Sequence, residues 1–248
     1  MLSEAAALHR LGVVVPAFNT TVEDEFAELK PPNVRHYVAR VRMPDAPLRD
    51  DDDQSRVVSQ AHADLDAAIA SVCQARPDVV VLGISIPAFW DGHAGAERLR
   101  QRCILAAEGR PVIIASDAVD AAVTAQGAAT VWGAVTPYRP DANRRVAEFL
   151  AELNAEVAAV ESVEPVTNFS IAEVAEDQAE QAVRSLLARG ATAVLQLGTN
   201  LRLPPRLRSE LGPGLLEVNR LLYTGALRAA EHGTRRSETV TSLGSQHV

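Results

Sequence analysis

Short apolar runs alternate with amphipathic segments along most of the chain. A short continuous apolar run is typical of a buried parallel strand, and apolar residues at helical spacing predict an amphipathic helix. In the first half, the pattern predicts strands over Leu11–Val15, His36–Val41, Asp78–Ile84 and Pro111–Ala115, and helices over Val22–Leu29, Ser55–Gln74 and Ala94–Ala107. The segment 36–41 alternates apolar and polar residues, which is typical of an exposed or edge strand.

The second half repeats this order. The pattern predicts strands over Thr130–Val135, Glu156–Val160, Thr192–Leu197 and Leu215–Val218, and helices over Asp141–Leu153, Ile171–Arg189, Pro205–Glu210 and Arg220–Glu231. Equivalent strand-end turns lie about 115–120 residues apart, the size of one small domain. We therefore expect an α/β fold of two similar parallel-sheet domains related by pseudo-two-fold symmetry.

The expected boundaries follow from the repeat. The first α/β half spans 1–117 and is joined by a C-terminal helix over 219–232, and the second half spans 118–218. The remaining segment, 233–248, is polar, and we expect it to be a loose tail.

Two predicted strands run into glycine-bearing turns with small polar residues. One turn is Gly83-Ile84-Ser85, and the other is Gly198-Thr199-Asn200. Open α/β sheets bind ligands at the carboxyl ends of their strands. Two such turns, one in each half, predict a small anionic ligand held between two half-sites.

Composition excludes several classes of function. The chain has 248 residues, and its net charge of −8 argues against general nucleic-acid binding, which needs a basic face. Its two cysteines, Cys73 and Cys103, lack metal-ligand spacing, so we expect buried free thiols and a reducing cytoplasm. The N-terminus does not fit a signal peptide, and no apolar stretch is long enough to span a bilayer.

Known cofactor and metal motifs are absent from the sequence. It contains no GxGxxG after the first strand, no GxxxxGK[ST], no HExxH, no paired CxxC and no GxSxG. The six histidines are scattered and form no ligand cluster. We therefore expect neither a metal nor a cofactor.

The strand-end segments carry a resemblance to a known family. Leu11–Glu23, with Asn19, resembles the opening of the maleate cis–trans isomerases, and Leu197–Arg202 resembles their second catalytic turn. Val135–Tyr138, followed by Asn143 and Arg145, also resembles the opening of that family, and Asn168 and Asn219 stand where that family has asparagines. The wider group is the Asp/Glu racemase superfamily, which includes the arylmalonate decarboxylases. The resemblance covers nearly all of the chain up to Arg228.

The resemblance implies a small carboxylate or dicarboxylate substrate at the interface of two α/β domains. In such a site, backbone N–H groups, hydroxyls and amides bind the carboxylate and stabilise an enediolate-like charge. It also implies one or two reactive cysteines, and here this chain departs from the family: Ile84 and Gly198 occupy the two cysteine positions. The resemblance further suggests a homo-oligomer.

Several residues are candidates for this site. We predict catalytic roles for Tyr138 and Ser85, as a proton donor or as oxyanion-hole hydroxyls. The predicted substrate-binding residues are Asn19, Ser85, Tyr138, Asn168, Gly198, Thr199 and Asn200. Each also has a structural interpretation: Asn19 as a helix-capping residue, Ser85 as a strand-end serine, Tyr138 as a packing residue and Gly198 as a tight turn.

The apolar segment Ile84–Trp90 has two interpretations. It is either a lid packed on the core or an apolar wall that favours loss of carbon dioxide from a malonate-like substrate. Asp91 and His93 follow it and are either solvated loop residues or an acid and a base. Asp117, Arg202 and Asn219 are weaker candidates near predicted strand ends.

Three functions remain open from the sequence. The first is a cofactor-independent enzyme that acts through an enediolate, with decarboxylation or another lyase step favoured because both cysteine positions are substituted. The second is a catalytically silent protein that binds a carboxylate. The third is an isomerase or racemase that uses an unrecognised acid or base, such as a cysteine placed elsewhere.

Overall fold

The computed structural model describes the backbone of residues 7–244 and the side chains of residues 7–232. The first half contains β1 (His9–Pro16), α1 (Thr21–Leu29), β2 (Val34–Val41), α2 (Asp51–Cys73), β3 (Val79–Leu82), the 3-10 helix η1 (Ile86–Ala88), α3 (Gly92–Ala106), β4 (Val112–Ile113) and α4 (Ala115–Gln126). The second half contains β5 (Val131–Thr136), α5 (Pro140–Glu152), β6 (Glu156–Ser162), η2 (Phe169–Glu173), α6 (Glu176–Ala188), β7 (Ala193–Gln196), α7 (Pro205–Leu211), η3 (Gly212–Gly214) and β8 (Leu215–Glu217). Helix α8 (Val218–Gly244) follows.

Each half forms a four-stranded sheet in which every pair of strands is parallel. The strand order is β2-β1-β3-β4 in the first sheet and β6-β5-β7-β8 in the second, so the same topology occurs twice. This confirms the predicted pair of α/β units. Strand β2 lies at a sheet edge as predicted, and Tyr37 and Val38 on it are exposed.

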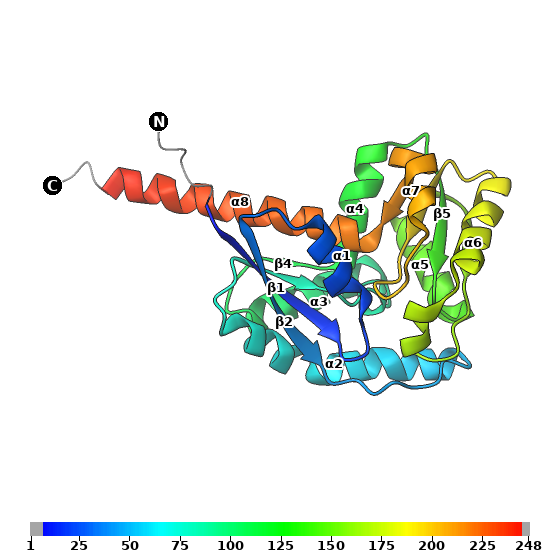
Figure 1. Ribbon diagram of the computed structural model, residues 1–248, viewed down its shortest axis with the longest axis horizontal. Coiled ribbons are helices and arrows are strands. Elements are labelled where there is room, and N and C mark those ends of the chain that lie inside the picture. Colours follow the sequence, from blue (N-terminus) through cyan, green and yellow to red (C-terminus); the bar gives the residue numbers. More distant parts are fainter. Residues whose placement is uncertain (1–6, 245–248) are drawn as a thin grey trace.

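The central strands carry the core, because helices cover both faces of a parallel sheet. All the residues of β3 and β7 are buried. Figure 1 shows the two sheets side by side, with α8 running along the first and projecting past it. Helix α8 buries Leu222, Ala226 and Ala230, which recur at helical spacing, and it packs against α1, α4, β1 and β3.

Several predicted boundaries are wrong. Helix α2 begins at Asp51, before the predicted start at Ser55, because the Asp50 side chain accepts the Asp53 N–H and the acidic first turn favours the positive end of the helix dipole. The predicted strand over 111–115 reduces to Val112–Ile113, and helix α4, which was not predicted, begins at Ala115.

Two predicted helices also differ from the structure. The helix over 171–189 is interrupted, since Ala175 adopts an extended conformation between η2 and α6. The last helix does not end at Glu231, and its backbone continues through Gly233 to Gly244, so this part of the expected loose tail is helical. The rest of that tail, 245–248, lies outside the described residues.

Candidate functional site

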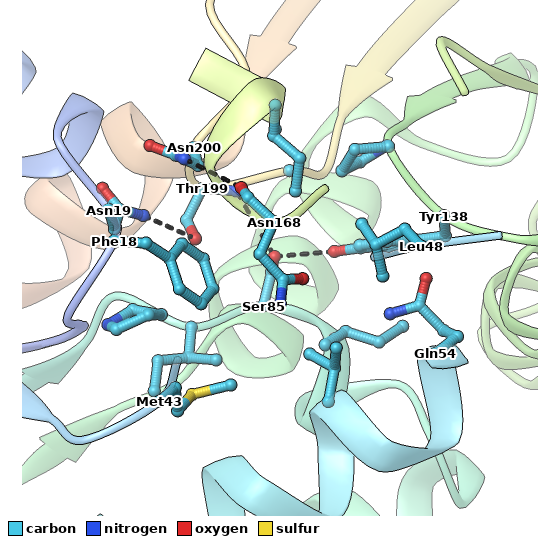
Figure 2. Close-up of a pocket in the computed structure, with 17 residues that line it drawn as sticks. Phe18, Asn19, Met43, Leu48, Gln54, Ser85, Tyr138, Asn168, Thr199 and Asn200 are labelled. Atoms are coloured by element: carbon cyan, nitrogen blue, oxygen red, sulfur yellow. Dashed lines mark hydrogen bonds between the residues drawn. The ribbon is translucent and has the colours of Figure 1, made fainter. Parts of the chain in front are cut away.

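A small cavity lies where carboxyl ends of strands from both halves meet (Figure 2). Its volume is about 50 Å³. Its polar lining comprises Asn19, Gln54, Ser85, Tyr138, Asn168, Thr199 and Asn200. Its remaining lining comprises Pro16, Phe18, Met43, Leu48, Val57, Ile84, Ile86, Pro137, Ile171 and Gly198. We call this space the interdomain cavity.

Every residue predicted to bind substrate lines the interdomain cavity, and so do both positions expected to have lost cysteines. Their roles there stay predictions. They come from segments as far apart in the chain as Asn19 and Asn200. The sequence did not indicate that a residue from a helix also lines the cavity. Gln54 lies in the first turns of α2, and no motif in the sequence marks it.

Asn19 has the capping role predicted for it, and its amide also lies at the cavity wall. Its side-chain oxygen accepts the N–H groups of Thr21 and Val22, both at 3.0 Å, so it caps the start of α1. Its Nδ2 donates across to Thr199 Oγ1 in the second half, at 3.3 Å. Capping therefore holds this amide at the cavity wall and aims its donor at the second glycine turn.

A chain of hydrogen bonds joins the two glycine turns to Tyr138. The Tyr138 hydroxyl donates to the Leu197 carbonyl oxygen at 2.7 Å, which uses its one proton. The Ser85 hydroxyl, 2.6 Å from Tyr138 Oη, must then donate to Tyr138. The Thr199 N–H in turn points to Ser85 Oγ at 3.4 Å. Burial raises the pKa of Tyr138 far above its usual range, and the weaker opposing effect comes from Ser85.

Several backbone donors on the two turns are free. Within residues 7–232, the N–H groups of Ile84, Ser85, Gly198 and Asn200 have no hydrogen-bond partner. Buried N–H groups are almost always paired, so free donors beside a cavity are typical of an anion or oxyanion site. These free N–H groups can donate hydrogen bonds to a carboxylate that bridges the two turns.

The interdomain cavity has no charged side chain among the residues lining it that the structure describes. Asp91 and His93 lie elsewhere, contrary to their possible role as acid and base. Asp91 faces Arg98 and Arg145, at 3.6 and 3.8 Å, while the His93 ring stacks on Phe149. The proposed apolar wall is also different: from Ile84–Trp90 only Ile84, Ser85 and Ile86 line the cavity, and Phe89 packs on Phe149 instead.

The weaker candidates also lie outside the cavity lining. Asp117 is in the first turn of α4, and Arg202 pairs with Asp24 at 3.0 Å. Asn219 contacts the second glycine turn from outside the cavity: its Nδ2 donates to the Thr199 carbonyl at 2.9 Å and to Glu25 Oε2 at 2.7 Å. It thereby supports the second glycine turn.

Neither cysteine lines the cavity. Cys73 and Cys103 are buried in α2 and α3, and burial raises the pKa of Cys103 to about 12. At Gly198, an added Cβ would lie 2.6 Å from Pro137 Cδ and 2.8 Å from Pro137 Cγ. A side chain at position 198 therefore requires Pro137 to move.

Metal-binding clusters and membrane-spanning helices are both absent from the described part of the chain. It holds no cluster of His, Cys, Asp and Glu side chains that could bind a metal ion. None of its helices is both long and apolar enough to cross a membrane.

No protein-family model matches this sequence, and no curated protein does. Solved structures do match it. Maleate cis–trans isomerase from Nocardia farcinica bound to Tris superposes with a TM-score of 0.78 at 18% identity, over 90% of this chain and 93% of that one. Maleate isomerase Iso from Pseudomonas putida S16 gives 0.74 at 19% identity, over 90% and 93%. Arylmalonate decarboxylase gives 0.64 at 20% identity, over 89% and 92%.

This chain therefore has the two-domain fold of the maleate isomerases and arylmalonate decarboxylases, as the resemblance predicted. At such low identity the likeness establishes the fold, and activity must be argued from the site itself.

Proposed function

We propose that this protein is a cofactor-independent enzyme that binds a small carboxylate in the interdomain cavity and decarboxylates a malonate-type acid. One observation carries the proposal: the cavity presents neutral hydrogen-bond donors from both halves but contains no thiol and no charged side chain among its described lining residues. Such a site can stabilise developing negative charge, and it has no group suited to nucleophilic attack.

The choice of decarboxylation follows from what the reaction needs to begin. Racemisation requires a base that removes a proton, and cysteine-dependent isomerisation requires a nucleophile. Decarboxylation requires neither: the C–C bond to one carboxylate breaks, carbon dioxide leaves, and the electron pair is delocalised onto the retained carboxylate as an enediolate. A proton then adds to the carbon to complete the reaction.

The two parts of the cavity suit the two carboxylates. We place the retained carboxylate against the free N–H groups of the glycine turns, where hydrogen bonds grow stronger as its charge increases. The departing carboxylate would lie against apolar side chains such as Phe18, Met43 and Leu48. Loss of its charge as carbon dioxide is favoured there, because an isolated carboxylate is poorly solvated by apolar groups.

The proton donor in this proposal is water. Tyr138 is the titratable side chain of the lining, but its proton is already donated to the Leu197 carbonyl and its raised pKa makes it a weak acid. Its role is then to orient the Ser85 hydroxyl, whose oxygen accepts a hydrogen bond from the Thr199 N–H.

Release of carbon dioxide from methylmalonate tests the proposal. We expect turnover by the purified protein and a loss of about 10- to 100-fold in kcat for Ser85→Ala, since removal of one oxyanion donor or its support has effects up to this order. A Ser59→Ala variant, changed on the exposed face of α2, is the matched control. Absence of turnover for a panel of small 2-substituted malonates contradicts the enzymatic proposal.

A silent carboxylate-binding protein is the second candidate. The observation that favours it is the same Tyr138 hydroxyl, whose proton is engaged within the protein. Ligand binding to the native state raises the melting temperature, so a thermal shift with malonate or methylmalonate but no release of carbon dioxide would establish this alternative.

A further inference from the structure

Gln54 presents an unpaired donor to the interdomain cavity. Its side chain is buried, and its Oε1 accepts the Arg139 N–H from the second half at 3.3 Å. Since a backbone N–H can only donate, this bond determines which end of the amide is which. Nε2 has no partner within residues 7–232, and Figure 2 shows it pointing toward the interior of the cavity.

Asn168 supplies a second unpaired amide. The residue is 1% exposed, and its Nδ2 has no hydrogen-bond partner among the described residues. Its backbone, by contrast, is held on both sides: its N–H donates to the Ala46 carbonyl at 3.1 Å, and its carbonyl accepts from Asn200 Nδ2 at 3.4 Å. Figure 2 shows the amide directed into the cavity.

A buried donor without a partner costs folding free energy, so its presence in a native protein needs an explanation. Asn168 Nδ2 is such a donor, and Gln54 Nε2 is a second donor of the lining without a partner among the described residues. Neither belongs to the glycine turns that we assign to the retained carboxylate. No charged side chain among the described lining residues would offset a second anion beside them. The complementary group is therefore a neutral oxygen acceptor.

We infer that Gln54 and Asn168 form an acceptor subsite, and that the substrate's substituent carries a carbonyl oxygen which these amides bind. This inference rests on the proposed function and specifies its substrate class. An apolar substituent of the same shape leaves both amides unpaired, and sites built around hydrogen bonds discriminate strongly against ligands that lack the matching group.

Three small acids of matched shape and number of non-hydrogen atoms test the subsite as product analogues. Malonamate carries a carboxylate and a neutral carbonyl, isovalerate carries a carboxylate and an apolar branch, and malonate carries two carboxylates. By calorimetric titration of the full-length protein, we expect malonamate to bind about 10-fold more tightly than isovalerate, the effect of one good hydrogen bond. Malonate should bind more weakly than malonamate.

Gln54→Met keeps the length of the side chain but removes the donor. We expect it to reduce the preference for malonamate over isovalerate several-fold, with the remaining preference due to Asn168, while isovalerate still binds, which reports an intact carboxylate site. Because Gln54→Met also removes the acceptor of the Arg139 N–H, Gln54→Glu serves as a second variant. It retains that acceptor, replaces Nε2 by an oxygen, and should abolish the preference for malonamate.

The outcomes separate the subsite from the proposed function. Equal binding of malonamate and isovalerate, or a preference that is undiminished in Gln54→Met and Gln54→Glu, overturns the acceptor subsite and leaves the carboxylate site standing. Tighter binding of malonate than of malonamate overturns the requirement for a neutral acceptor. If none of the three acids binds, the carboxylate site is overturned, and the subsite with it.

Discussion

Ser85 Oγ in the first half and Tyr138 Oη in the second half lie 2.6 Å apart, and this contact connects the two halves at the base of the cavity. Both residues are buried. Since Tyr138 also donates to the Leu197 carbonyl, its hydroxyl satisfies one group from each half. The same side chain therefore supports the site and the interface between the sheets.

Tyr138→Phe removes both of these hydrogen bonds without changing the packed ring. We expect a loss of about 1–3 kcal/mol in the free energy of unfolding, because the Leu197 carbonyl and the Ser85 hydroxyl are left buried and unpaired. Urea denaturation measures this loss. The control is Tyr37→Phe on edge strand β2, where the ring is exposed. Equal stability of the two variants would contradict the role of the Tyr138 hydroxyl.

Placing a thiol at position 198 should destabilise the protein. The Cβ of Gly198→Cys would lie 2.6 Å from Pro137 Cδ, and overpacking of a core typically costs about 1–3 kcal/mol. Pro137→Ala removes the obstructing ring atoms. In a double-mutant cycle, Gly198→Cys should then be less harmful in the Pro137→Ala background than alone. Additive effects in thermal unfolding would show that Pro137 does not exclude a side chain there.

Asn168→Leu should raise stability while it weakens binding. The Asn168 amide makes no hydrogen bond within the described residues, so the substitution removes an unpaired polar group and breaks no contact of that amide. We expect a gain of about 1 kcal/mol in unfolding free energy, together with a several-fold weaker Kd for malonamate. Gln181→Leu, at an exposed position of α6 outside the cavity, is the control for binding. A fall in melting temperature would show that the amide has a structural role.

Alkylation of the native protein should leave its function unchanged. Cys73 and Cys103 are buried away from the cavity, and the pKa of Cys103, raised to about 12 by burial, keeps its thiol protonated at neutral pH. After treatment with iodoacetamide at pH 7.5, malonamate binding and any decarboxylation should match those of untreated protein. Loss of turnover that is prevented in Cys73→Ser or Cys103→Ser would revive the cysteine-dependent isomerase.

His36 should contribute to acid sensitivity. Burial between Phe26 and Tyr223, with a smaller effect from Lys30, lowers the pKa of His36 to about 4. Because the unfolded chain then binds a proton more readily, this contribution to stability is present above the unfolded pKa of about 6.5 and is lost as the pH falls through 4. We expect a loss of about 1–2 kcal/mol after allowance for solvent screening of a half-buried ring.

His36→Phe should flatten that part of the profile of unfolding free energy against pH. Val38→Thr, a change without a titratable group at an exposed position of the same strand, should leave it unchanged. If His36→Phe has the same pH dependence as the wild type between pH 7 and 4, another group is responsible.

The periodic pattern was sufficient for the strands and for their duplicated order. The periodic pattern did not predict helix α4, because its segment, ASDAVDAAVTAQ, consists largely of alanine and small polar residues. Alanine favours a helix strongly, but it marks a buried face weakly. Likewise, a lone Gly233 did not end α8, because an isolated glycine lowers helix stability by only about 1 kcal/mol.

By itself, the sequence determined the residues at the strand ends, because in a parallel sheet the chain order and the direction of the strands place those residues along one edge. Ser85 and the Gly198–Asn200 turn were identified in this way, while Asn19 and Tyr138 were assigned to the site from the resemblance to the maleate cis–trans isomerases. Only the tertiary structure decided that Gln54 joins them, that Asp91 and His93 turn away, and that Tyr138 gives its proton to Leu197. These outcomes depend on how the two halves pack, and that packing involves contacts between residues far apart in the chain, on which local periodicity carries no information.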